Sequence, residues 1–283
     1  MRHLRLGTVV LAPAVVLAAP LGAAGQVPPP PPPLSLGLPM AGAEAEEFLR
    51  TATVMKRTPL GKGVTRSDQV TLTDGTRVHR ALWKTIHEHK MGLQRLEGVG
   101  LEFDFRDSWK SEVAAYELDK LLGLGLVPPT VERRLGGRVG SLQIWIEGAM
   151  TDDERRQKGL EAEDPAAWNA QMHRVRLLHQ LTYNTDYRNV RNVLIDPSFR
   201  IYAVDSSRAF RIQTDLMSPE DLVCFSRATL ERLAALDRPT LEARLGSWLV
   251  KRQIEGLLGR REKILALVKQ RVAERGEDTV LYP

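Results

Sequence analysis

The chain has 283 residues, of which 43% are apolar and 27% are charged, the proportions of an ordinary globular protein with material for one large domain or two lobes. Its formal net charge of +5 is too small to indicate nucleic-acid binding, and no basic run is interleaved with aromatic residues. The single cysteine, Cys224, excludes an internal disulfide, and its helical sequence context predicts a small buried residue.

The first 25 residues have the pattern of a cleaved secretory signal peptide. A short basic start, MRHLR, precedes the apolar stretch LGTVVLAPAVVLAAPLG, and the small residues AAG at 23–25 can form the cleavage site. The apolar stretch is shorter than the roughly 20 residues of a membrane span, and Pro13 and Pro20 interrupt it. We therefore expect a secreted or periplasmic protein with no transmembrane span after cleavage; an uncleaved anchor is the alternative.

Residues 26–43 form a low-complexity segment with six consecutive prolines at 28–33. Polyproline is stiff and extended, so this segment is predicted to be a linker between the signal and the folded part. Its use as a ligand for a proline-recognition domain is the second interpretation.

The pattern between Thr53 and His87 predicts strands. The segments TATVM, DQVTLTDG and RVHRALWKTI are short and rich in β-branched residues, and the turn signals PLGKG and Asp74-Gly75 separate them.

An amphipathic helix is predicted within SWKSEVAAYELDKLLGLG, residues 108–125. Apolar residues recur there at near-helical spacing. Ser108 or Ser111 can cap its start, and Gly123 and Gly125 can end it.

Two further strands are expected at 130–135 (TVERRL) and 139–150 (VGSLQIWIEGAM). The chain from Pro165 onward is predicted to be largely helical. Residues 218–275 are predicted to be helical throughout, beginning at the cap-and-proline pattern of Ser218-Pro219.

This order of elements predicts an α+β, two-lobed, protein-kinase-like fold. The small β-rich N-lobe, with one helix and the hinge, would span residues 44–149, and the larger, mainly helical C-lobe would span 150–283. Many other α+β proteins share the order of elements, so it does not define a function by itself.

Two acids lie in polar breaks between apolar runs near the middle of the chain. Asp186 is in YNTDYRNVRNVLID (183–196), and Asp205 is in IYAVDSSRAF (201–210). Asn189 and Asn192 lie between them. Phosphoryl transfer from ATP uses such a set: one carboxylate orients or deprotonates the acceptor, and an Asn and a second Asp hold the magnesium ion.

Lys84 ends a predicted strand, and a helix with Glu112 follows it. A strand lysine of this kind can contact the α- and β-phosphates and pair with a helix glutamate, with Glu117 as the alternate partner. A lysine after an apolar strand is also common without such a role.

Two backbone segments are candidates for nucleotide contact. Gly61 and Gly63, in PLGKGVT, can let backbone N–H groups approach phosphates, although a lone G-x-G is more often only a turn. In GSLQIWIEG, the backbone of Trp145, Ile146 and Glu147 can contact the adenine edge; an ordinary buried strand fits that pattern equally well.

Several blocks resemble atypical kinases. SEVAAYELDKLLGLGLVPPTVERR is similar to a helix and strand of the Golgi casein kinase family of the secretory pathway. GSLQIWIEG, NTD…N and AVDSSRAF resemble the type II phosphatidylinositol 4-kinases, and the Asp-centred loop is shared in outline with HipA-type kinases. Together these blocks cover residues 59–210 in the same order.

The resemblance implies an atypical kinase that uses ATP with Mg²⁺ or Mn²⁺. Lys84 and Glu112 would form the ion pair, Asp186 would be the catalytic carboxylate, and Asn192 and Asp205 would bind the metal.

One spacing departs from the kinase pattern. Kinases place the catalytic Asp five residues before the metal-binding Asn, whereas Asp186 and Asn192 are six apart. The simplest account is one extra residue at Tyr187. Either the loop bulges and restores the position of Asp186, or the site binds nucleotide without efficient transfer.

The sequence therefore predicts an exported phosphotransferase that moves the γ-phosphate of ATP to a hydroxyl of a protein, lipid headgroup or sugar. The first alternative is a non-catalytic pseudokinase that binds nucleotide and acts as an interaction module. The second is an exported α+β scaffold unrelated to nucleotides.

Overall fold

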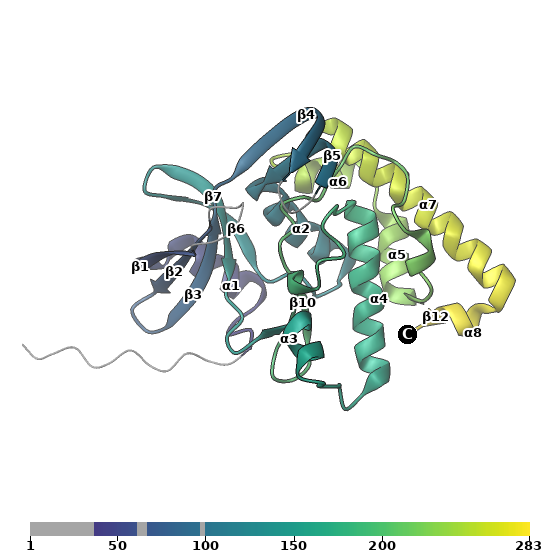
Figure 1. Cartoon of the computed structure of the whole chain (residues 1–283), viewed down its shortest axis with the longest axis horizontal. Coiled ribbons are helices and arrows are strands. Elements are labelled where there is room, and N and C mark those ends of the chain that lie inside the picture. Colours follow the sequence, from purple (N-terminus) through teal and green to yellow (C-terminus); the bar gives the residue numbers. More distant parts are fainter. Residues whose placement is uncertain (1–36, 61–66, 97–99) are drawn as a thin grey trace, which may run out of the picture. The chain divides into compact units, whose positions relative to one another are not determined.

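A five-stranded antiparallel sheet with the order β1-β2-β3-β7-β6 forms the core of the N-terminal lobe (Figure 1). The computed structural model describes residues 37–60, 67–96 and 100–283. The strands are β1 (Thr53–Leu60), β2 (Ser67–Thr73), β3 (Val78–Lys84), β7 (Arg138–Ile144) and β6 (Thr130–Leu135).

The side chains of β3 alternate between the two faces of this sheet, as the period of a strand requires. Ala81 and Trp83 are buried in the hydrophobic core of the lobe. Leu82 and Lys84 share the opposite face and line a cavity described below. The strand period therefore places the lysine on the side of the sheet where a ligand can reach it.

Helices α1 (Gly42–Thr51) and α2 (Trp109–Leu122) pack against strands β6 and β7. Glu46 of α1 accepts hydrogen bonds from Tyr116 Oη at 3.1 Å and from Lys120 Nζ at 2.6 Å, which join the two helices. The sequence interpretation missed α1, although its buried residues Ala45, Phe48 and Leu49 have helical spacing.

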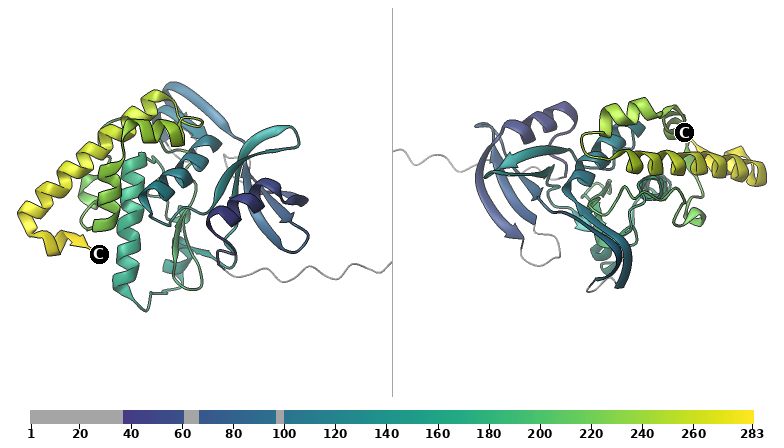
Figure 2. Two further views of the ribbon diagram at one scale, coloured as in Figure 1. Left: turned by 180° about the vertical axis from the view of Figure 1, so that it is seen from behind. Right: turned by 90° about the horizontal axis from the view of Figure 1, so that it is seen from above.

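A separate hairpin lies between β3 and α2 in the chain, formed by β4 (His87–Leu96) and β5 (Gly100–Ser108) (Figure 2). Its base is closed by a hydrogen bond from the backbone N–H of Trp109 to the carbonyl of Ile86, at 2.8 Å. The sequence interpretation assigned no strands here.

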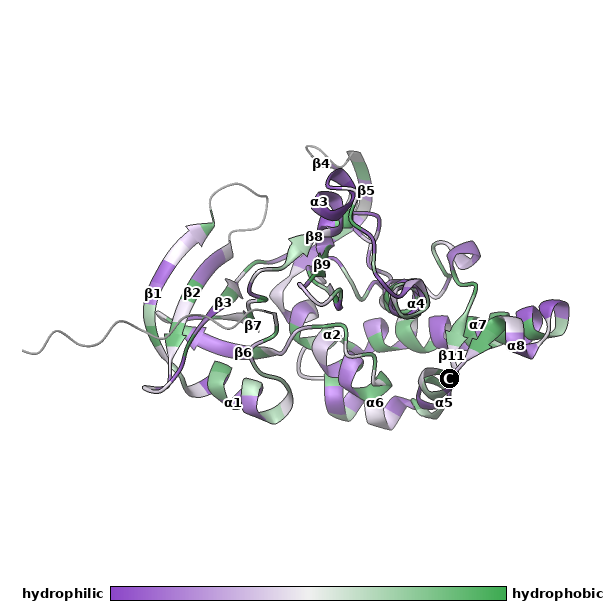
Figure 3. Ribbon diagram, turned by 90° about the horizontal axis from the view of Figure 1, so that it is seen from below, coloured by the Kyte–Doolittle hydropathy of each residue, from purple (hydrophilic) through white to green (hydrophobic). Residues whose placement is uncertain are grey.

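Helix α2 has the caps that its sequence predicts. The side chain of Ser108 accepts a hydrogen bond from the N–H of Lys110, and Gly123 ends the helix in the left-handed conformation with φ of 63°. The carboxylate of Asp119 then accepts hydrogen bonds from the backbone N–H groups of Gly125, Leu126 and Val127 at 3.1, 2.9 and 3.2 Å. This carboxylate fixes the chain as it leaves the helix. Helix α2 also contacts α5 and α6 of the second lobe (Figure 3).

The C-terminal lobe is mainly helical, with a small sheet of order β10-β9-β8. Its elements are β8 (Met150–Thr151), α3 (Asp152–Gln157), α4 (Pro165–Thr182), η1 (Val190–Asn192), β9 (Val193–Ile195), β10 (Ile201–Ala203), η2 (Pro219–Asp221), β11 (Phe225–Ser226), α5 (Arg227–Ala235), α6 (Arg238–Leu245), α7 (Lys251–Arg275), α8 (Glu277–Val280) and β12 (Leu281–Tyr282). In the described parts of the chain, every helix is too short or too polar to cross a lipid bilayer.

The prediction of continuous helices from residue 218 is wrong in its first part. Ser218 precedes only one 3-10 turn, Pro219–Asp221, and its side chain makes no cap; its hydroxyl is hydrogen-bonded to Tyr187 Oη at 2.6 Å instead. Strand β11 follows, and it pairs with β12. Cys224 is also not a buried helical residue, because it lies half-buried in the irregular segment before β11.

We expect Asp119→Ala to destabilise the protein strongly. The substitution leaves three backbone donors after α2 without their acceptor, and an unsatisfied buried donor costs roughly 1–3 kcal/mol. Urea denaturation should show a loss of several kcal/mol. The control is Asp237→Ala, which removes an exposed helix cap of α6 and should lower the stability much less. Equal losses in the two variants would contradict this role of Asp119.

Candidate functional site

A cavity of about 530 Å³ lies between the sheet of the N-terminal lobe and the β9–β10 region. Most of its lining is apolar, with Leu82, Ile146 and Leu194 among the residues. Lys84, Asn192 and Asp205 supply polar and charged groups; the remaining lining residues are Leu60, Ser67, Gln143, Ile144, Trp145, Ala149, Thr151 and Val204. An apolar cavity with a few convergent polar groups is the usual form of a small-molecule site.

The ammonium of Lys84 lies between two carboxylates. Lys84 Nζ is 2.5 Å from Glu112 Oε1 and 2.8 Å from Asp205 Oδ1. Burial lowers the pKa of Lys84, but the two carboxylates outweigh it, so the pKa is raised above its ordinary value. The lysine therefore keeps its positive charge inside the protein.

Glu112, in the first turn of α2, joins three parts of the chain. Besides the pair with Lys84, its Oε2 accepts the backbone N–H of Ser206 at 3.0 Å. Burial raises the pKa of Glu112, and the charge of Lys84 offsets this only in part. Glu117, the alternate partner considered for Lys84, instead pairs with Lys120 at 2.8 Å and Arg244 at 2.7 Å.

Asp205 follows strand β10 and has a left-handed backbone with φ of 57°, which is uncommon for a residue other than glycine. Its Oδ1 accepts hydrogen bonds from Lys84 and from Ser207 Oγ, the latter at 3.0 Å. Burial raises the pKa of Asp205, but Lys84 lowers it by more, so the carboxyl is held ionised.

The carboxylate of Asp186 faces Asn192. Its Oδ2 accepts hydrogen bonds from Asn189 Nδ2 at 3.1 Å and from Asn192 Nδ2 at 2.8 Å. The side-chain oxygen of Asn184 accepts a hydrogen bond from the backbone N–H of Asp186 at 3.1 Å. The side-chain nitrogen of Asn184 donates one to the backbone carbonyl of Asp205 at 3.4 Å. The two acids are thus connected through one amide side chain.

The extra residue, Tyr187, points away from this cluster. Its ring packs edge-on against His179, with the ring centroids 6.5 Å apart, and its hydroxyl is bonded to Ser218. Two successive turns absorb the additional length: Tyr187 N–H donates to the carbonyl of Asn184 at 3.1 Å, and Asn189 N–H donates to that of Asp186 at 3.0 Å. The loop therefore bulges at Tyr187 while Asp186 stays in contact with Asn192.

Asn192 and Asp205 have oxygen atoms that suit a hard divalent cation. The amide nitrogen of Asn192 donates a hydrogen bond to Asp186, so the side-chain oxygen of Asn192 can bind another partner. Lys84 and Ser207 both donate hydrogen bonds to Oδ1 of Asp205, so Oδ2 is the oxygen that could bind a cation. Residues 37–60, 67–96 and 100–283 contain no group of three or more His, Cys, Asp or Glu side chains that could hold a metal. A cation such as Mg²⁺, which protein sites usually hold with one or two carboxylates and substrate phosphates, fits this set.

The predicted nucleotide contacts fall into three groups. Trp145 and Ile146 line the cavity. Glu147 does not, because its backbone N–H and carbonyl are both bonded to Gly37, at 3.0 and 2.7 Å, and its side chain pairs with Arg80. Gly61 and Gly63 lie outside the described residues.

Glu102, on β5, was missed by the sequence interpretation. Its carboxylate pairs with Arg208 and Arg211 and accepts a hydrogen bond from Thr185 Oγ1 at 3.2 Å. Arg208 Nη1 also lies 3.8 Å from Asp186 Oδ1. The β4–β5 hairpin thereby contacts the residue before Asp186 and the segment that follows Asp205. The alternating pattern of residues 100–108 was the available signal.

No protein-family model matches the chain, and no curated protein matches it in sequence. Among solved structures, hydra Fam20, determined with sugar, superposes with a TM-score of 0.63 at 13% identity over 88% of this chain and 95% of that chain. The Golgi casein kinase superposes with a TM-score of 0.60 at 14% identity, over 84% and 76%.

The fold is therefore the two-lobed fold of an atypical kinase, as the order of elements predicted. The likeness to Golgi casein kinase that the sequence indicated is confirmed at the level of the fold.

We expect Lys84→Met to destabilise the protein, by about 3–5 kcal/mol, because the carboxylates of Glu112 and Asp205 then face each other without their cation. The loss of stability should be smaller near pH 5 than near pH 8. Burial raises the pKa of Glu112, and a raised pKa in the folded state contributes stability at low pH that is lost as the pH rises through it.

Urea denaturation at the two pH values measures this effect. The double variant Lys84→Met/Glu112→Gln removes the unpaired charge and should recover part of the stability and lose most of the pH dependence. If Lys84→Met unfolds like wild type at both pH values, the buried pair does not have the energetic role described here.

Proposed function

We propose that this protein is an exported kinase-like phosphotransferase that moves the γ-phosphate of ATP to a hydroxyl group. One observation carries the proposal: Lys84, Asn192 and Asp205 line a single cavity, and Asp186 is hydrogen-bonded to one of them, Asn192. These are the groups that phosphoryl transfer requires, held by parts of the chain far apart in sequence.

Each residue has a role that follows from its contacts. Lys84, kept protonated by Glu112 and Asp205, would bind the α- and β-phosphates. Asn192 and Asp205 would hold Mg²⁺ or Mn²⁺, which offsets the negative charge of the phosphates when bound. The apolar residues Leu82, Ile146 and Leu194 would pack against the adenine ring, and Gly61 and Gly63 would cover the phosphates.

Asp186 would orient the acceptor hydroxyl and take its proton. Two amide groups hold Oδ2, so Oδ1 is the oxygen available to the acceptor. Its position next to Asn192 would bring the hydroxyl close to the γ-phosphate. Correct placement is the main protein contribution to this chemistry.

A second candidate function is a pseudokinase that binds nucleotide without transfer. Arg208 Nη1 lies 3.8 Å from Asp186 Oδ1, the oxygen that the acceptor hydroxyl would need, so the guanidinium competes with the acceptor for this atom. Metal-dependent ATP binding without phosphate incorporation would favour this function.

Export and the acceptor are further parts of the proposal. The signal pattern of residues 1–25 favours a secreted or periplasmic location, and one structural neighbour is named as a Golgi kinase. The acceptor would be a protein, a lipid headgroup or a sugar. The structure of hydra Fam20 contains sugar, so a glycan acceptor is worth an early test.

We expect Asp205→Ala to weaken metal-dependent ATP binding and to reduce phosphate incorporation by at least about a hundredfold, because it removes a metal ligand and a partner of Lys84. Calorimetry with ATP and Mg²⁺ or Mn²⁺, and autophosphorylation with labelled ATP, provide the two readouts. Asp215→Ala is the matched control, since Asp215 is exposed and pairs with Lys263 away from the cavity. If wild type and Asp205→Ala behave alike in both assays, the proposal is wrong.

Deletion of Tyr187 should lower transfer by roughly a hundredfold, although it restores the five-residue spacing. The loop already places Asp186 against Asn192, so a shorter loop would displace the carboxylate. Tyr187→Phe is the control; it keeps the loop length and should cost only about 1 kcal/mol of stability through the lost bond to Ser218. A deletion variant as active as wild type would show that the bulge has no catalytic importance.

A further inference from the structure

The segment after Asp205 carries two arginines, Arg208 and Arg211, that share one carboxylate of the β4–β5 hairpin. Arg208 pairs with Oε2 of Glu102, and Arg211 pairs with Oε1. The side chains of the two arginines are 13% and 3% exposed, and that of Glu102 is 12% exposed. One largely buried carboxylate therefore holds two guanidinium groups. None of the three residues has a role in the transfer step proposed above.

Arg211 fixes the position of Glu102. The guanidinium of Arg211 also donates hydrogen bonds to the backbone carbonyl of Asp104 and, at 3.3 Å, to that of Arg208. Thr185 Oγ1 donates a further hydrogen bond to Glu102 Oε1, at 3.2 Å. Because Arg211 and Thr185 both bind Oε1, the second oxygen of Glu102 is directed to Arg208.

Arg208 is held through one of its terminal nitrogens only. Its Nη2 is bonded to Glu102, whereas its Nη1 lies 3.8 Å from Oδ1 of Asp186. Charge-assisted N–H···O bonds are about 2.7–2.9 Å long, so Nη1 lies roughly 1 Å too far away to form one. Within the part of the chain that the structure describes, the hydrogen bonds to the Asp186 carboxylate all go to Oδ2. Oδ1 is therefore open, and the guanidinium of Arg208 is close enough to occupy it.

We infer that Glu102 is a positioning residue that keeps Arg208 away from the carboxylate of Asp186. The inference rests on the proposed role of Asp186 in binding the acceptor hydroxyl. Among the described residues, Asp186 is the other carboxylate within ion-pair distance of Arg208. Without the charge of Glu102, Arg208 bonds to Oδ1 of Asp186, because a guanidinium matches the geometry of a carboxylate. The acceptor hydroxyl then has to displace it. The ion pair between Glu102 and Arg208 thus favours transfer over the pseudokinase function.

Crystal structures of wild type and Glu102→Gln test the inference without any phosphate transfer. Glutamine keeps the size of the side chain and removes its charge. Arg208 Nη1 should therefore move from about 3.8 Å to within hydrogen-bond distance of Asp186 Oδ1. If Arg208 keeps its position in Glu102→Gln, or turns to a different partner, Glu102 does not hold it away from Asp186.

Autophosphorylation with labelled ATP gives the functional readout. Glu102→Gln should lower phosphate incorporation by about tenfold or more, because a charge-assisted bond now competes with the acceptor. The affinity for ATP with Mg²⁺, measured by calorimetry, should stay unchanged, because the cavity residues Lys84, Asn192 and Asp205 are intact. The double variant Glu102→Gln/Arg208→Gln should recover most of the lost transfer. A purely structural role of Glu102 gives no such recovery, so a double variant as slow as Glu102→Gln would overturn the inference.

Arg208→Gln alone provides a second test, which decides the matter if Glu102→Gln does not fold. Its removal of the competing guanidinium should leave phosphate incorporation at least as high as in wild type. A loss of about tenfold in this variant, with the fold intact, would show that Arg208 assists transfer instead of obstructing it, against the inference.

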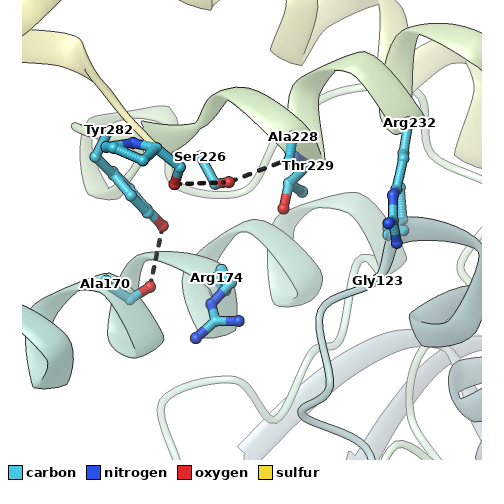
Figure 4. A pocket seen from close by; sticks show the side chains of 10 residues that line it. Gly123, Ala170, Arg174, Ser226, Ala228, Thr229, Arg232 and Tyr282 are labelled. Atoms are coloured by element: carbon cyan, nitrogen blue, oxygen red, sulfur yellow. Dashed lines mark hydrogen bonds between the residues drawn. The ribbon is translucent and has the colours of Figure 1, made fainter.

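Two exposed residues offer matched controls that should behave like wild type in both assays. Glu88→Gln changes a glutamate of the same hairpin that pairs with Lys90. Arg232→Gln changes an arginine of the same lobe that lies beside Gly123 at the end of α2 (Figure 4). If folded wild type incorporates no phosphate, the kinase proposal fails, and the position of Arg208 in the two crystal structures still decides whether Glu102 holds it.

Discussion

One buried ammonium between two carboxylates connects the parts of this fold that would carry function. Lys84 belongs to β3, Glu112 to α2, and Asp205 to the segment after β10, so a single cluster fixes three elements. A buried ion pair is weak evidence for stability, because desolvation costs about as much as the attraction returns. The cluster matters because it holds β3, α2 and the segment after β10 in fixed positions relative to one another. It also has one negative charge in excess, which a divalent cation at Asp205 would offset.

The loop with Asp186 shows why spacing in a sequence is an uncertain guide to spacing in space. A catalytic carboxylate needs a defined distance to its neighbours, whatever number of residues intervenes. The additional residue is tolerated because Tyr187 has its own environment between His179 and Ser218. The backbone turns around it and returns Asn192 to Asp186.

The features that the sequence predicted well depend on local chemistry. The caps of α2 at Ser108 and Gly123 are visible in the residues themselves, and β3 shows the period of a strand. The order of strand and helix indicated a partner for Lys84 on α2 but left both Glu112 and Glu117 open, and the structure pairs the lysine with Glu112. Ser218 shows the limit of such signals, because a distant tyrosine takes the hydroxyl that would cap a helix.

The features that the sequence missed depend on contacts between distant residues. Glu102 pairs with Arg208 and Arg211 across 106 and 109 positions, and no local pattern reveals such a partner. Hairpin β4–β5 did have a period-two pattern, but its many polar residues hid it from an interpretation based on apolar runs.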